Sequence, residues 1–139
     1  MNIVDIMTPK VVAIHAQDNL SKACCVLEDA GVRHLIVIDA AGRLAGIVSD
    51  RDCKLAVQSP YSVYDQETAE TFAERILVEK IMTPTPECID PMSSVQEAAY
   101  IMLDKHISAL PVTQDGNVIG IVTSTDLLGV LAGKPETTA

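Results

Sequence analysis

The stretch Gly46-Ile47-Val48-Ser49-Asp50-Arg51-Asp52 decides the architecture, because the chain contains it a second time as Gly120-Ile121-Val122-Thr123-Ser124-Thr125-Asp126. An apolar run followed by a hydroxyl residue and, three positions later, an aspartate predicts a buried strand that leads into the N-terminus of a helix. A repeated unit determines the architecture before any local assignment is made. The rest of the chain is therefore best compared with itself, outward from these two copies.

Two further segments repeat at nearly the same spacing. Ile6-Met7-Thr8-Pro9 returns 75 positions later as Ile81-Met82-Thr83-Pro84, and Val32 to Val37 returns 75 positions later as Ile107 to Val112. The Gly-Ile-Val motifs are only 74 positions apart, so the second copy lacks one residue between Val112 and Gly120. A turn tolerates such a loss, whereas a strand would turn its side chains to the wrong face. The sequence predicts two copies that differ by one turn residue.

Each copy has the pattern strand, helix, strand, strand, helix, which predicts an α+β fold. The first copy has predicted strands at 11–14, 35–38 and 44–48 and predicted helices at 20–30, closed by Gly31, and at 50–57. In the second copy a capping box from Ser93 to Gln96 opens a helix whose apolar stripe ends at Leu103. Strands at 110–113 and 118–122 and a helix at 124–131 follow, and Ala41-Gly42 and Asp115-Gly116 predict tight hairpins.

The repeats set the predicted boundaries. The first domain covers 1–58, a connecting segment covers 59–78, the second domain covers 79–132, and a flexible tail covers 133–139. A helix is expected from Glu67 to Glu79, because Phe72, Ile76 and Leu77 are apolar and its start is acidic. With 139 residues, 48% of them apolar, the chain can bury a core without disulfides or metals.

Charge and composition exclude several classes of partner. The formal net charge is −9 and no cluster of Lys and Arg exists, which argues against a nucleic-acid partner. No apolar run approaches the roughly 20 residues that cross a bilayer, and the N-terminus has an acid where a signal peptide has bases, so we expect no membrane partner and a cytoplasmic location. The four cysteines lack Cys-x-x-Cys spacing and are expected to be reduced, mostly buried thiols. The three histidines lie far apart, so no metal site is expected.

These motifs together resemble a tandem pair of cystathionine-β-synthase (CBS) domains, also called a Bateman module, over nearly the whole chain. The Ile-Met-Thr-Pro openings, the Leu-Pro-Val strand of the second copy and the doubled Gly-Ile-Val-(Ser/Thr)-x-x-Asp carry the resemblance. It implies one compact module in which two β-α-β-β-α repeats pack sheet to sheet about a pseudo-twofold axis. It also implies two clefts that hold AMP, ADP, ATP or S-adenosylmethionine, and a homodimer formed through the helices.

The (Ser/Thr)-x-x-Asp spacing has two interpretations. A carboxylate at a helix start can accept hydrogen bonds from both hydroxyls of a ribose, and a hydroxyl with free backbone amides can hold phosphate oxygens. The same spacing is also an ordinary helix cap. Recurrence after Gly-Ile-Val in both copies favours ligand binding at one site or more, and capping remains the alternative.

The resemblance, carried over residue by residue, makes the two clefts unequal. The favoured cleft comprises Asp126, Thr123, Thr125, Val12, Ala13, Arg33, His34 and Arg51, and the second comprises Asp52, Ser49, Cys88, Ile107, Ser108 and Ala109. The first has two arginines for phosphate, and a histidine that would add a charge below about pH 6.5. The second gains no cation and has Glu87 nearby. We therefore expect a phosphorylated adenosine in the first cleft, and a less charged adenosyl group or nothing in the second. The alternative for Arg33 and Arg51 is a solvated surface charge.

No catalytic motif is present: the chain has no phosphate-binding Gly-x-x-x-x-Gly-Lys loop, no nucleophile elbow and no metal-ligand constellation. The sequence therefore predicts a non-catalytic sensor with no obligatory cofactor, which binds an adenine nucleotide, with or without Mg²⁺, or S-adenosylmethionine. Its protein target is unknown. Two other classes stay open, namely an interaction or scaffold module with vestigial clefts, and an enzyme that acts on nucleotides.

Overall fold

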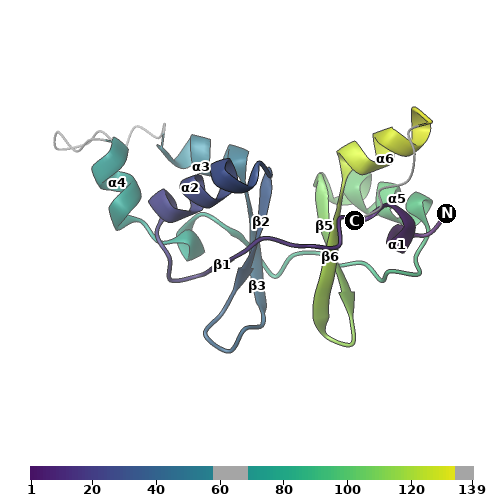
Figure 1. Cartoon of the computed structure of the whole chain (residues 1–139), viewed down its shortest axis with the longest axis horizontal. Helices are drawn as coiled ribbons and strands as arrows, with labels where there is room; N and C mark the ends of the chain where they lie inside the picture. The colour runs from purple at the N-terminus through teal and green to yellow at the C-terminus, as the bar shows by residue number, and fades with distance from the viewer. Residues whose placement is uncertain (58–68, 134–139) are drawn as a thin grey trace. The chain divides into compact units, whose positions relative to one another are not determined.

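The computed structural model describes residues 1–57 and 69–133 (Figure 1). The chain forms two compact units. The first unit is Val12–Thr85, and the second unit combines Met1–Val11 with Pro86–Ala139. Each unit contains a sheet and helices, so the predicted α+β fold is confirmed.

The first unit has a four-stranded sheet in the order β1-β2-β3-β4, with β1 parallel to β2 and the other pairs antiparallel. Its elements are β1 (Ala13–His15), α2 (Leu20–Ala30), β2 (His34–Ile38), β3 (Leu44–Ser49), α3 (Asp50–Val57), α4 (Ala69–Arg75), the 3-10 helix η2 (Val78–Lys80) and β4 (Thr83–Pro84). Leu20 and Leu27 of α2 and Cys53 of α3 pack with Leu35 and Val48 of the strands in one core. Strands and helices therefore share a single apolar interior.

The second unit repeats this plan with fewer strand residues. Its elements are α1 (Ile3–Ile6), α5 (Val95–Lys105), β5 (Ala109–Gln114), β6 (Asn117–Thr123) and α6 (Ser124–Leu131). Single bridges extend the β5-β6 hairpin on both edges, a parallel bridge from Ile89 to Val112 and an antiparallel one from Thr8 to Ile121. The bridging residues occupy the places of β1 and β4, so the strand order of the two sheets is the same.

The openings of the two copies are exchanged between the units. Thr83 pairs with Ile47 and Pro84 with Gly46, although the sequence opens the second copy at Ile81. Thr8 exchanges backbone hydrogen bonds of 2.9 and 3.0 Å with Ile121. Each Met-Thr-Pro segment thus completes the sheet of the other copy, and the chain passes between the units after Val11 and after Thr85. The predicted boundaries follow the repeats along the sequence. The contacts instead place each Met-Thr-Pro segment in the unit formed by the other copy.

Two glycines permit this exchange. A Cβ atom built on Gly46 would lie 2.6 Å from Met82 Sδ and 2.8 Å from the Thr83 carbonyl oxygen. One built on Gly120 would lie 2.6 Å from Met7 Sδ and 2.9 Å from the Thr8 carbonyl oxygen. These distances are shorter than a carbon atom allows, so the crossing segment can approach the strand only where it has no side chain.

The hairpins explain the change of spacing from 75 to 74. In the first, Asp39 N donates to Arg43 O at 2.9 Å across three residues, the last of which is Gly42 at φ +79°. In the second, Gln114 pairs with Asn117 around two residues, both in the left-handed region. One turn residue is therefore missing from the second copy, as the sequence predicts.

Most predicted elements agree with the structure, and the final helices match residue for residue. The capping box was misplaced by one residue: Ser94, not Ser93, caps α5 and accepts from Glu97 N at 3.1 Å. Ser93 N instead donates to Asp90 O in the preceding turn. The first strand is Ala13–His15 rather than 11–14, and Leu103 is 77% exposed rather than part of the buried stripe.

The connecting helix from Glu67 to Glu79 was predicted too long. The structure has α4 over Ala69–Arg75, a break at Ile76 and Leu77, and then η2. The break occurs because Leu20 N donates to Ile76 O and Val78 N donates to Asp18 O, so these groups pair outside a continuous helix. The predicted start of this helix, the polar break at 58–62 and all but Gly133 of the predicted tail lie outside the described residues.

We predict that Gly46→Ala and Gly120→Ala each lower the free energy of unfolding by about 1–3 kcal/mol, because the added methyl displaces the crossing Met-Thr segment. Urea denaturation of the purified variants measures this loss. Gly42→Ala is the control: its Cβ meets nothing within 4 Å, so it carries only the cost of its φ of +79°. A smaller loss at Gly46 and Gly120 than at Gly42 would contradict the steric explanation.

Candidate functional site

Both (Ser/Thr)-x-x-Asp motifs form helix caps. In the first unit Ser49 N donates to Asp52 Oδ2 at 2.9 Å, and Asp52 N donates to Ser49 Oγ at 3.0 Å. In the second unit Thr123 N donates to Asp126 Oδ2 at 2.8 Å, and Asp126 N donates to Thr123 Oγ1 at 3.4 Å. The capping interpretation is therefore correct for both motifs.

Capping engages only one oxygen of each carboxylate. Among the described residues, the hydrogen bonds to Asp52 and Asp126 all end on Oδ2, and none ends on Oδ1. Both aspartates are half-buried. A carboxylate oxygen has two acceptor positions, so each Oδ1 can accept a pair of hydroxyl donors while Oδ2 holds the helix start. The cap orients the carboxylate, and Oδ1 accepts no hydrogen bond from the described residues.

The cap alone does not distinguish these aspartates. Asn2 N donates to Asp5 Oδ2 at 2.8 Å, and His15 N donates to Asp18 Oδ2 at 3.0 Å. What Asp52 and Asp126 share is their place, because each lies in the first turn of the helix that directly follows the strand containing Gly-Ile-Val. Position at the end of a strand, not the hydrogen-bond pattern, separates the two candidates from ordinary caps.

Arg33 and His34 lie beside the Asp52 cap. His34 pairs with Ser49 across β2 and β3, and Asp50 N donates to Arg33 O at 2.8 Å. The resemblance assigned these two residues to the cleft of Asp126, so this adjacency was missed. The signal was available in the sequence: a hairpin places the first residue of one strand opposite the last residue of the next.

Burial lowers the pKa of His34 below its usual 6.5, and the positive charge of Arg33 lowers it further, while the Asp52 carboxylate acts in the opposite direction. The expected charge on His34 below about pH 6.5 is therefore wrong, because the ring stays neutral to a lower pH. Arg33 and Arg51 are exposed, and neither has an ion-pair partner within 1–57 and 69–133. The guanidinium groups, not the imidazole, are the available cations.

The residues predicted for the favoured cleft are divided between the units. Val12, Ala13, Arg33, His34 and Arg51 belong to the first unit, and Thr123, Thr125 and Asp126 to the second. In the first unit Ile36 N donates to Val12 O at 2.9 Å, next to the pairing of Ala13 with Ile36. The assembly of this cleft from both units stays a prediction.

The residues predicted for the second cleft are divided in the same way. Ser49 and Asp52 belong to the first unit, and Cys88, Ile107, Ser108 and Ala109 to the second. Ala109 pairs with Thr123, and Ser124 N donates to Ser108 O at 2.9 Å, so this strand entrance lies beside the Asp126 cap. Within each unit, the strand entrance predicted for one cleft thus adjoins the aspartate predicted for the other.

The thiols differ in exposure. Cys53 is buried, and burial raises its pKa to about 12. Cys88 is half-buried and donates to Pro86 O at 3.4 Å, and its pKa is raised by burial and by the charge of Glu87. Cys24 is half-buried and Cys25 is exposed, so the expectation of mostly buried thiols was wrong: only Cys53 of the four is buried. Cys25 lies on the outer side of α2, one residue beyond the apolar stripe.

Within the described ranges, no helix has both the length and the apolar character needed to cross a membrane. Over those same residues, no group of three or more His, Cys, Asp or Glu side chains is arranged to hold a metal ion.

Comparison with known proteins identifies the class. The family model for the CBS domain matches residues 3–59 and 78–133, and the chain therefore belongs to the CBS domain family. It is 33% identical over 130 residues to a CBS domain-containing protein of Dictyostelium discoideum, a match that covers 93% of this chain and 90% of that protein. It is also 30% identical to the homoserine O-acetyltransferase of Methanohalophilus mahii, over 96% of this chain but only 25% of that enzyme.

A solved structure shows the same fold. The chain is similar to the CBS domain pair of protein MJ0100, crystallised in complex with 5′-methylthioadenosine and S-adenosyl-L-methionine. The TM-score is 0.77 at 26% identity, and the match covers 96% of this chain and 97% of that chain. The resemblance inferred from the sequence is confirmed.

We predict that the free energy of unfolding falls as the pH drops below about 6.5. The pKa of His34 is lowered in the folded chain, so the unfolded chain binds the proton first and gains stability relative to the fold. Denaturation at pH 7.5 and pH 5.5 measures the difference. His34→Gln should lose less stability over this interval than the parent chain, whereas the exposed His15→Gln should behave like the parent. An identical pH dependence in the parent and His34→Gln would refute the assignment.

Proposed function

We propose that the chain is a non-catalytic regulatory module whose two CBS repeats together bind an adenosine-containing ligand: AMP, ADP, ATP or S-adenosylmethionine. The observation that carries this proposal is the doubled aspartate at a strand end, held through Oδ2 with Oδ1 available. Membership of the CBS family and the adenosyl ligands of the MJ0100 domain pair support the ligand class.

The two sites should differ in the charge they accept. Each aspartate would accept the ribose hydroxyls, and Thr123 and Thr125 or Ser49 would offer hydroxyls to the ligand. The favoured cleft takes its cations from Arg33 and Arg51, which are exposed and without ion-pair partners in the described part of the chain. The second cleft has no comparable cation and has Glu87 nearby. We expect phosphorylated adenosines to prefer the Asp126 site, with Mg²⁺ bound through the phosphates if it is present.

The module would report its ligand through a population shift. A ligand that contacts residues of both units favours arrangements in which both sets of contacts form, and only this differential affinity moves the equilibrium. No obligatory cofactor is needed for this mechanism. The readout would pass to a protein target in the cytoplasm, the location that the sequence predicts.

A homodimer through the helices is part of this proposal. Tyr100 and Leu103 on α5 are 70% and 77% exposed, and Leu128 and Leu131 on α6 are 62% and 83% exposed. Apolar side chains gathered on two neighbouring helices mark an interaction surface. They support association of this chain with a second copy.

An interaction module with vestigial clefts is the second candidate. It is favoured by the capping role of Asp52 and Asp126, since the caps alone give both aspartates a structural role. Such a protein would gain no stability from any adenosyl compound.

Thermal-shift titration with AMP, ATP and S-adenosylmethionine tests the proposal. A ligand at 100 times its Kd stabilises the fold by about 2.7 kcal/mol. Asp126→Ala should weaken AMP and ATP binding by roughly 10- to 100-fold, the effect of losing hydrogen bonds to a charged group. Asp52→Ala should weaken it less.

Matched controls separate capping from binding. Asp5→Ala removes a similar cap in the second unit, and Asp18→Ala removes the same kind of backbone-to-carboxylate hydrogen bond from a turn in the first. Asp5→Ala and Asp18→Ala should lower the melting temperature, as Asp52→Ala and Asp126→Ala should. The two controls should nevertheless keep the full thermal shift with ligand. Equal losses of affinity from Asp52→Ala and Asp126→Ala would refute the proposal that the two clefts are unequal. The absence of a thermal shift with any of the ligands would refute ligand binding and favour the interaction module.

A further inference from the structure

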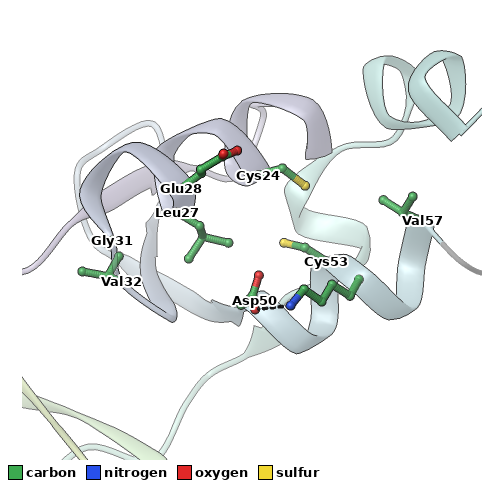
Figure 2. Close-up of a pocket in the computed structure, with 9 residues that line it drawn as sticks. Cys24, Leu27, Glu28, Gly31, Val32, Asp50, Cys53 and Val57 are labelled. Carbon is green, nitrogen blue, oxygen red and sulfur yellow. Dashed lines mark ion pairs between the residues drawn. The ribbon is translucent and has the colours of Figure 1, made fainter.

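Two thiols from different helices meet in the first unit. Cys24 lies on α2 and Cys53 on α3, and their sulfur atoms point toward one another (Figure 2). The two side chains interact through a hydrogen bond. Cys53 belongs to the apolar core of the unit, and Cys24 packs against that core. Two regular helices therefore hold the thiols in contact.

A hollow between α2 and α3 gives small molecules a route to this pair. Its volume is about 460 Å³, and both Cys24 and Cys53 line it, together with the apolar side chains of Leu27 and Val32. Figure 2 shows the two sulfur atoms on opposite sides of the space between the helices. Cys53 is only 1% exposed, yet a small oxidant that enters the hollow meets both sulfurs.

The second copy of the repeat builds the same helix contact without thiols. The repeat relates α2 to α5 by 75 positions and α3 to α6 by 74, so Ala99 corresponds to Cys24 and Leu127 to Cys53. Leu127 packs against the core of its own unit. Since an alanine and a leucine serve the fold at these positions, packing alone does not require two thiols in the first unit.

We propose that Cys24 and Cys53 form a reversible disulfide that ties α2 to α3, so that the first unit contains a site of oxidation by a small peroxide. A disulfide needs two sulfurs that face one another from backbone already close enough to be bridged. The contact between α2 and α3 supplies this arrangement. The site goes beyond the proposed function and does not depend on it.

The chemistry balances with hydrogen peroxide as the oxidant. The Cys24 sulfur attacks one oxygen of the peroxide, the O–O bond breaks and water leaves, so Cys24 becomes a sulfenic acid. The Cys53 sulfur then attacks Cys24 Sγ, the S–O bond breaks, and the hydroxyl leaves as water with the proton of the Cys53 thiol. The two thiols lose two electrons in total, and the peroxide takes up both as two waters form.

The surroundings decide which sulfur reacts first. Burial raises the pKa of both thiols, that of Cys53 to about 12. The hydrogen bond between them favours the ionised form of Cys24 and disfavours that of Cys53. Cys24 is therefore the sulfur that attacks the oxidant, because the thiolate is the nucleophile. Since little of either thiol is ionised at neutral pH, the bond forms slowly.

The other two thiols do not share this arrangement. Cys25 is exposed and directly follows Cys24 on α2, and consecutive residues of a helix do not face one another. Cys88 belongs to the second unit, where it donates to Pro86 O. Cys24 is thus the thiol of the first unit that faces Cys53.

Oxidation of the full chain with hydrogen peroxide tests the proposal. The chain is treated for hours at pH 7.5, free thiols are blocked with iodoacetamide, and the protein is digested without reductant. Mass spectrometry should find two peptides joined through Cys24 and Cys53, and dithiothreitol should separate them. The same link should form in Cys25→Ala. It should be absent from Cys24→Ala, which has the residue of the second copy at this position.

Two results would overturn the proposal. One is a disulfide that joins Cys24 or Cys53 to a different cysteine. The other is the recovery of Cys24 and Cys53 as free thiols from a chain whose exposed Cys25 has been oxidised. The state of Cys25 in the same digest shows that the oxidant was active.

Urea denaturation measures whether the bond ties the helices. A disulfide restricts the unfolded chain, so the oxidised protein should unfold at roughly 1–2 M more urea than the reduced protein. Peroxide-treated Cys24→Ala should unfold at the same urea concentration as its untreated form. An unchanged or lower midpoint in a chain that carries the bond would refute the tie between α2 and α3.

These measurements are independent of ligand binding. A chain that forms the disulfide and shows no thermal shift with adenosyl compounds would support the oxidation site and refute the proposed function. A chain that binds nucleotide and forms no disulfide would overturn only the oxidation site.

Discussion

The close approach of a Met-Thr segment to a side-chain-free strand position is the contact on which the rest of the structure depends. It occurs twice, at Gly46 and at Gly120, and in each case the approaching segment comes from the other copy of the repeat. Because of this exchange, neither copy of the repeat contains the whole of its unit: the first unit includes Thr83 and Pro84, and the second includes Met1–Val11. A side chain at either glycine would separate the segment from the sheet edge and expose the backbone groups that pair there.

At the helix starts, a single carboxylate oxygen satisfies the backbone. Ser49 with Asp52 and Thr123 with Asp126 satisfy backbone amides that would otherwise be unpaired, and they do so with one carboxylate oxygen each. The cap holds the aspartate in one orientation, so a ligand would meet a preorganised acceptor. Capping and ligand binding are therefore compatible functions of one side chain.

The two copies have diverged on their helices more than in their strands. Leu35 and Leu110, Val37 and Val112, and Val48 and Val122 are equivalent and fully buried, as sheet cores require. The outer helix positions are free of that constraint, and there Glu28 and Lys54 are replaced by Leu103 and Leu128. Divergence of this kind gives a chain two unlike surfaces from one repeated fold.

The sequence by itself determined the repeat, the order of strands and helices, the missing turn residue and the family, because apolar periodicity and turn chemistry are local properties. Only the tertiary structure decided that Thr8 and Thr83 pair with the opposite copies and that Ile76 and Leu77 interrupt a helix. Each of these depends on hydrogen bonds and burial between residues distant in the chain, and no local pattern records which partner a backbone group will find.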